Sequence, residues 1–203
     1  DRCVMLAMTA ILAGGHILVD DIPGVGKTTL AIAFAKAMNL ENKRTQFTPD
    51  VLPSDILGFT MYNKDSGQFY YQPGTVMCNL FLADEINRTS PKTQSALLEV
   101  MEEGSVTVDG VTREVPHPFI VIATQNPAGS IGTQLLPESQ LDRFMVCLSV
   151  GYPSLEDEIA IAKGKSNDIL NLVEAVINGE ELVKIQKTVN DVFISDDVYK
   201  YIC

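Results

Sequence analysis

The sequence predicts an α/β fold, a three-layer sandwich in which helices cover both faces of a central five-stranded parallel sheet, followed by a helical appendage. Short apolar runs alternate with helix-forming segments up to about residue 150, and this order is typical of parallel sheets with helical crossovers. Beyond the break at Gly151 and Pro153 the chain looks helical to its end. We therefore expect an α/β domain over residues 1–152 and an incomplete helical unit over residues 153–203.

The five predicted strands are short, and four of them are strongly apolar. They are HILVD (16–20), KRTQFT (43–48), NLFLADE (79–85), FIVIATQ (119–125) and MVCLSV (145–150). Such apolar runs are expected where a strand is buried on both faces of a parallel sheet. The predicted helices occupy residues 3–13, 27–38, 92–104 and 136–144, with a short one near 53–58.

Two predicted hairpins interrupt this alternation. The first joins GFTMY (58–62) to QFYYQ (68–72), and its aromatic cluster favours local packing or a subunit contact over base stacking. The second is SVTVDGVTREV (105–115), in which Asp-Gly supplies the positive φ angles of a type I′ turn. The segments that carry these hairpins cover about 48–76 and 104–115, outside the alternating strands and helices.

Composition narrows the class of protein. Hydrophobic residues make up 46% and charged residues 20%, which indicates a globular chain rather than a disordered one. The net charge of −11 argues against broad binding to nucleic acid or to an anionic membrane. No apolar run approaches the roughly 20 residues that cross a bilayer. The chain begins with aspartate in a helical pattern, so we expect a fragment of a longer protein.

The cysteines and histidines give no sign of a metal site. The four cysteines are far apart and form no C-x-x-C pair, which suits buried thiols in a reducing, cytoplasmic location. His16 and His117 have no third ligand nearby in the sequence.

The segment DDIPGVGKTT (20–29) has the pattern of a phosphate-binding loop, except that Asp21 stands where G-x-x-x-x-G-K-[ST] has its first glycine. It is either a working nucleotide site with one substitution or a chance glycine-rich turn. In a working site Lys27 would reach the β- and γ-phosphates and Thr28 would ligate Mg²⁺. We expect the Asp21 carboxylate to cap neighbouring N–H groups and to point away from the phosphates. The expected phosphate-binding residues are Pro23, Gly24, Val25, Gly26, Lys27, Thr28 and Thr29.

Two adjacent acids end the third predicted strand. Four apolar residues precede Asp84 and Glu85. Because ligands gather at the carboxyl ends of parallel strands, we expect Asp84 to hold Mg²⁺ and Glu85 to act as the general base for the attacking water. The alternative is a pair of exposed carboxylates in a surface loop.

The fourth strand ends in ATQNP, where Asn126 is placed to hydrogen-bond the γ-phosphate and the attacking water; otherwise it starts a turn before Pro127. Arg143 is either an arginine finger for the nucleotide of a neighbouring subunit or a surface partner of Asp142 or Glu138. For Arg88 a structural or intersubunit salt bridge is favoured over direct catalysis.

Taken together, PGVGKTT, LFLADEINR, PKTQSALLEVMEEG, ATQNP and LPESQLDRF resemble the MoxR family of AAA+ ATPases. The resemblance is collinear and runs from about residue 10 to 160. It implies a P-loop NTPase core that uses ATP and Mg²⁺ and hydrolyses ATP to ADP and phosphate. It also implies a ring, expected to be hexameric, that works as a chaperone-like remodelling machine, often beside a protein with a von Willebrand factor A domain.

The chain departs from the family pattern in three ways. Asp21 replaces the first glycine of the loop, the segment that would contact adenine precedes residue 1, and the helical lid over 153–203 is incomplete. A sensor-two arginine therefore has no counterpart that the sequence identifies.

Two other functions stay open at this point. One is a nucleotide-gated assembly scaffold with little turnover. The other is a DNA-unwinding relative. The net negative charge argues against it, and so do the hairpins, whose only basic residues are Lys64 and Arg113.

Overall fold

The computed structural model describes residues 2–21, 26–125, 136–163 and 169–202. Its centre is a five-stranded sheet in the order β2-β5-β8-β1-β9, in which all neighbouring strands run parallel. The strands are β1 (Ile17–Asp20), β2 (Asn42–Gln46), β5 (Leu80–Asp84), β8 (Ile120–Gln125) and β9 (Val146–Leu148). The predicted five-stranded parallel sheet is confirmed, although β9 is shorter than the expected 145–150.

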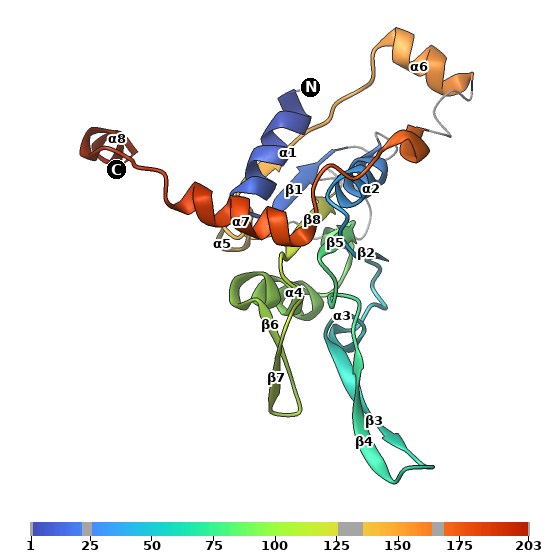
Figure 1. The fold of residues 1–203 in the computed structure, drawn as a ribbon. Helices are drawn as coiled ribbons and strands as arrows, with labels where there is room; N and C mark the ends of the chain where they lie inside the picture. Colours follow the sequence, from blue (N-terminus) through green and yellow to red (C-terminus); the bar gives the residue numbers. More distant parts are fainter. Residues whose placement is uncertain (1, 22–25, 126–135, 164–168, 203) are drawn as a thin grey trace.

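Helices cover both faces of the sheet, so the predicted three-layer sandwich is confirmed (Figure 1). One layer holds α1 (Arg2–Leu12), α2 (Lys27–Ala37) and α7 (Gly179–Asn190), and the other holds α3 (Pro53–Leu57) and α4 (Pro91–Glu103). Every residue of β5 and β8 is buried. Burial on both faces is the physical reason that these strands are apolar up to their polar carboxyl ends rather than alternating.

The order of the strands decides which side chains meet. Strand β8 lies between β5 and β1, with Leu82 beside Ile122 and Val19 beside Thr124. The carboxyl ends of these three strands therefore share one edge of the sheet. Strand β2 lies at an edge of the sheet, and its side chains alternate between exposed and half-buried.

Two antiparallel hairpins project to the same side of the sheet (Figure 1). They are β3 (Gly58–Asn63) with β4 (Gln68–Pro73), and β6 (Ser105–Val108) with β7 (Val111–Glu114). Both occur where the sequence predicts them. The two hairpins are in contact: the guanidinium of Arg113 on β7 lies 4.1 Å from the centre of the Tyr71 ring on β4.

The remaining elements are mostly short or peripheral. They are the 3-10 turns η1 (Ile86–Arg88) and η2 (Ile169–Leu172), and the helices α5 (Glu138–Leu141), α6 (Leu155–Ala162) and α8 (Asp196–Ile202). Helices α6 and α8 bury none of their described residues and stand away from the sheet (Figure 1). Helix α7 instead inserts Leu182 into the core beside Ile11 and Phe34. The domain boundary near residue 152 stays a prediction.

No described helix is both long and apolar enough to cross a membrane. His16 is a half-buried structural residue, with Nδ1 accepting from the Val121 N–H at 3.0 Å and Nε2 lying 3.1 Å from the Met101 carbonyl oxygen. Burial lowers the pKa of this imidazole, and the Met101 hydrogen bond opposes that shift.

Candidate active site

The phosphate-loop segment leads directly into helix α2. Gly26 caps this helix with φ 86° and ψ 16°, in the left-handed region that favours glycine. Thr28 is half-buried and Thr29 exposed in the first turn of α2. Pro23, Gly24 and Val25 lie outside the described residues, so their expected contacts with phosphate stay predictions.

The first helical residue, Lys27, is buried with only 8% of its surface exposed. Its Nζ donates to the main-chain oxygen of Asp21 at 2.7 Å. Burial lowers the pKa of this ammonium, and the negative charges of Asp84, Asp21, Glu85 and Asp20 oppose the shift. The lysine therefore lies within the field of the acids at the carboxyl ends of β1 and β5.

The carboxylate of Asp21 ties the loop to the chain that follows β9. Its Oδ2 accepts hydrogen bonds from the Gly151 N–H at 2.7 Å and the Ser149 hydroxyl at 3.1 Å. The side chain thus caps an N–H group, as the sequence predicts, although the partner is 130 residues away. Strand β9 ends at Leu148, and Ser149 and Gly151 bind this carboxylate just beyond that point.

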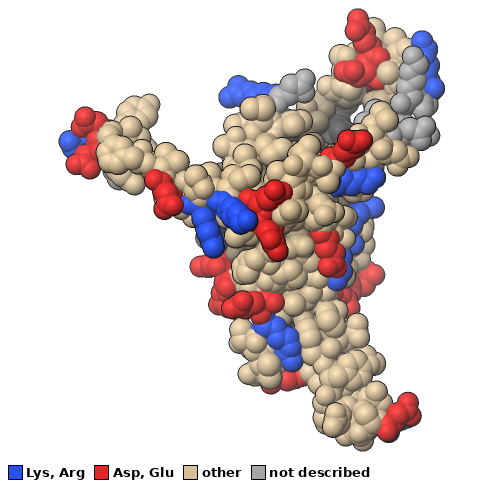
Figure 2. Space-filling view, in the orientation of Figure 1, with Lys and Arg blue, Asp and Glu red and all other residues tan. Residues whose placement is uncertain are grey.

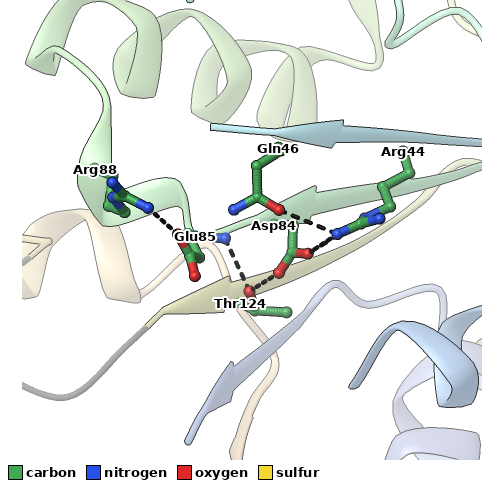
Figure 3. Close-up of polar contacts among 6 residues, drawn as sticks. All are labelled: Arg44, Gln46, Asp84, Glu85, Arg88 and Thr124. Carbon is green, nitrogen blue, oxygen red and sulfur yellow. Dashed lines mark hydrogen bonds and ion pairs between the residues drawn. The ribbon is translucent and has the colours of Figure 1, made fainter. Parts of the chain in front are cut away.

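Asp84 and Glu85 lie together at the end of β5, and Thr124 of β8 joins them (Figure 3). The Thr124 hydroxyl donates to Asp84 Oδ1 at 2.6 Å and accepts from the Glu85 N–H at 2.9 Å. Glu85 has φ 57° and ψ 48°, an uncommon conformation for a residue with a side chain. One buried hydroxyl therefore fixes both the metal-binding candidate and the turn that carries the candidate base.

Each acid also pairs with an arginine. Arg44 of β2 reaches Asp84 Oδ2 with Nη2 at 2.7 Å and Nε at 3.3 Å. Arg88 of η1 reaches Glu85 Oε2 at 2.7 Å. The Arg88 pair agrees with the structural salt bridge favoured from the sequence, whereas its alternative as an intersubunit contact stays a prediction.

Arg143 contacts other elements. Its guanidinium pairs with Glu102 of α4 at 2.8 Å and donates to the Ser139 carbonyl oxygen at 2.7 Å. Glu102, rather than the expected Asp142 or Glu138, is therefore its ion-pair partner in this chain. Arg143 thus meets α4 and α5 rather than the two acids, and its role as a finger toward another subunit stays a prediction. Asn126 lies outside the described residues.

The structure adds two residues that sequence reasoning missed, Thr124 and Arg44. The only signal for Thr124 is its place two residues before Asn126 in ATQNP. Arg44 lies in the least apolar of the predicted strands, and a charged side chain within a strand is the signal that the sequence offers for it.

The donor set suits Mg²⁺. This ion prefers oxygen ligands and is usually held by one or two carboxylates together with phosphate oxygens and waters. Asp84 offers a carboxylate that is 8% exposed, and the residue after Lys27 is a threonine in the first turn of α2. The pairing of Asp84 with Arg44 shows that this position attracts positive charge in the folded chain.

Comparison with known proteins gives concordant matches. The model of the ATPase family associated with various cellular activities (AAA) matches residues 16–146. The uncharacterized protein YeaC of Bacillus subtilis is 52% identical over 98% of this chain and 62% of its own length. The chaperone MoxR1 of Mycobacterium tuberculosis is 46% identical over 78% of this chain and 42% of its own length.

A solved structure agrees with these matches. The crystal structure of a candidate ATPase from Cytophaga hutchinsonii superposes with a TM-score of 0.87 and 41% identity, over 99% of this chain and 61% of that one. The chain thus spans between about two fifths and three fifths of the length of these relatives.

Proposed function

The chain belongs to the MoxR family of AAA+ ATPases, and on that basis we propose that it binds ATP with Mg²⁺ and hydrolyses it to ADP and phosphate. The observation that carries the proposal is that Lys27, Asp84 and Glu85 lie at the same carboxyl edge of the sheet. Lys27 Nζ donates to the Asp21 main-chain oxygen just beyond β1 at 2.7 Å, and the two acids end β5, with β8 between these strands. Parallel sheets bind ligands at this edge.

Each of these residues has a distinct role in the proposed reaction. Lys27 leaves the Asp21 carbonyl oxygen and binds the phosphate oxygens, and Thr28 and Asp84 hold Mg²⁺, which neutralises phosphate charge when bound. Glu85 takes the proton of the attacking water. Arg88 already pairs with Oε2 of Glu85, so a water held at that oxygen would take the place of the guanidinium.

The remaining roles extend to a neighbouring subunit and to residues outside the described part of the chain. We propose that Arg143 serves the nucleotide of an adjacent protomer in a ring, expected to be hexameric, after releasing Glu102. Asn126 serves as the sensor of the γ-phosphate. Gly24, Val25 and Gly26 wrap the phosphates with main-chain N–H groups, and Pro23, which has no N–H, shapes the turn that precedes them.

The proposed biological role is chaperone-like remodelling in the cytoplasm, with a von Willebrand factor A domain protein as the expected type of partner. A relative with 46% identity carries the name chaperone, which supports this role. Basic side chains are scattered among acidic ones on the face shown in Figure 2, and a nucleic-acid partner is not part of the proposal.

A test in the full-length protein separates binding from chemistry. We expect Glu85→Gln to retain ATP binding and to lower phosphate release by at least about a hundredfold, since the base is lost. Lys27→Ala should abolish binding. Glu114→Gln, which changes an exposed carboxylate of β7, serves as the matched control and should leave both unchanged. Full turnover by Glu85→Gln would contradict the assigned role.

The ion pairs on both acids favour one alternative, a nucleotide-gated assembly scaffold with little turnover. In that case ATP would change the size of the assembly while phosphate release stayed near background. Sizing with and without a non-hydrolysable ATP analogue, together with a phosphate-release assay, separates the two functions.

A further inference from the structure

Both carboxylate oxygens of Asp84 are already occupied (Figure 3). Oδ1 accepts the Thr124 hydroxyl at 2.6 Å, and Oδ2 accepts two N–H groups of Arg44 at 2.7 and 3.3 Å. The Lys27 ammonium donates instead to a main-chain oxygen of the loop, at 2.7 Å. Among the described residues, Arg44 is therefore the cation that forms an ion pair with Asp84.

The two partners of this pair differ in their freedom to move. The Asp84 side chain is 12% exposed, whereas that of Arg44 is 51% exposed. Thr124, the other partner of Asp84, is fully buried in the middle of the sheet. Asp84 is thus held in place, and the guanidinium is the group that can leave.

The position of Arg44 also allows its side chain to move away from Asp84. Strand β2 is an edge strand, so Arg44 can swing toward solvent without moving a core side chain. Its Nη2 already donates to Oε1 of Gln46 at 3.1 Å, and this oxygen remains as an acceptor when a metal ion binds the carboxylate.

We propose that Arg44 is a built-in counter-ion for Asp84, which occupies the cation position of the site until a divalent metal displaces it. The inference rests on the proposed function, since it concerns the same metal position. A metal ion bound at Oδ2 would lie beside the guanidinium, and like charges that close repel one another. Loading the metal therefore requires the Arg44–Asp84 pair to break.

The consequence is that the Arg44–Asp84 pair lowers the apparent affinity of the site for the metal ion. The protein with Arg44 paired is the metal-incompetent state, and the apparent affinity for metal falls by the fraction of molecules in that state. The same ion pair gives the nearly buried Asp84 carboxylate a positively charged partner while the metal ion and the nucleotide are absent.

The test is direct binding of Mn²⁺, a spectroscopic substitute for Mg²⁺, to the full-length protein, measured by the paramagnetic resonance signal of the free ion. We expect Arg44→Gln to tighten Mn²⁺ binding by about three- to fivefold, the range for a half-exposed ion pair. Without metal, Arg44→Gln should melt at a lower temperature than the wild type, and Mn²⁺ should remove that difference.

Lys43→Gln is the matched control. It removes the same charge from the neighbouring position of β2, where Lys43 bonds to the Met77 carbonyl oxygen at 2.9 Å rather than to Asp84. It should leave Mn²⁺ affinity unchanged within about twofold. In an Asp84→Asn background, Arg44→Gln should give no gain at all.

The outcomes separate this inference from the proposed function. Equal or weaker Mn²⁺ binding by Arg44→Gln, or an equal gain from Lys43→Gln, overturns the counter-ion role while the ATPase proposal stands. A wild type that binds no Mn²⁺ even with ATP overturns both. A gain in Arg44→Gln that disappears with Asp84→Asn supports the inference, whatever the rate of ATP hydrolysis.

Discussion

The hydroxyl of Thr124 joins the two candidate catalytic acids, and its removal should affect both stability and turnover. Thr124→Val keeps the shape of the side chain but removes the donor to Asp84 Oδ1 at 2.6 Å and the acceptor for the Glu85 N–H at 2.9 Å. Thr124 is 0% exposed, so water cannot replace either bond. Losing these bonds costs about 1–3 kcal/mol for each buried group that is left unpaired.

A gain of roughly 0.8 kcal/mol from the added apolar group offsets part of this loss. We therefore expect Thr124→Val to lower the free energy of unfolding by about 1–5 kcal/mol, measured by urea denaturation. We also expect turnover to fall by roughly ten- to a hundredfold, the effect of an active-site group displaced by about 1 Å. Phosphate release at saturating ATP measures this second effect.

Two variants keep the reasoning falsifiable. Thr124→Ser retains the hydroxyl and should recover most of the turnover, whereas a role limited to side-chain packing would not favour serine over valine. Thr60→Val on β3, outside the site, should leave both quantities unchanged. The reasoning fails if Thr124→Val matches the wild type in stability and rate, or if Thr124→Ser is no more active than Thr124→Val.

Three further predictions concern stability, each measured by urea denaturation. Asp21→Gly should cost about 1–2 kcal/mol, since the Gly151 N–H loses its acceptor, and Asp21→Asn, which keeps an acceptor, should cost less. Burial lowers the pKa of His16, so as the pH falls below about 6.5 protons bind the unfolded chain first and stability should decrease. His16→Gln should flatten that decrease. Gly74→Ala should cost about 3 kcal/mol or more, because a Cβ there meets the main chain at Ile56 and Gly58.

The strands and the two acids were predictable because their signals are local. An apolar run followed by Asp84 and Glu85 marks both a buried strand and its polar end without knowledge of any other element. The phosphate loop is local in the same sense, since glycines followed by Lys27 and Thr28 form one short segment.

The partners of these residues could not be predicted, because they depend on the spatial order of the strands. Thr124 meets Asp84 only because β8 lies beside β5, and Arg44 meets it because β2 lies on the other side of β5. Neither neighbour follows from periodicity along the chain. The pairing of Arg143 with Glu102 has the same origin, since local spacing points to acids next to it in the sequence and the fold brings in α4.

The first hairpin has a fixed root. Gly58 is both the cap of α3 and the first residue of β3, and Gly74 packs so closely on the main chain of α3 that no Cβ fits. The Tyr71 hydroxyl adds a bond to the Leu57 carbonyl oxygen at 2.5 Å. Helix α3 in turn packs against α4, which begins just after the Glu85–Arg88 pair. The root of the hairpin is thus joined through α3 and α4 to the turn that carries the Glu85–Arg88 pair, so a displacement of α4 would reach both the hairpin and that turn.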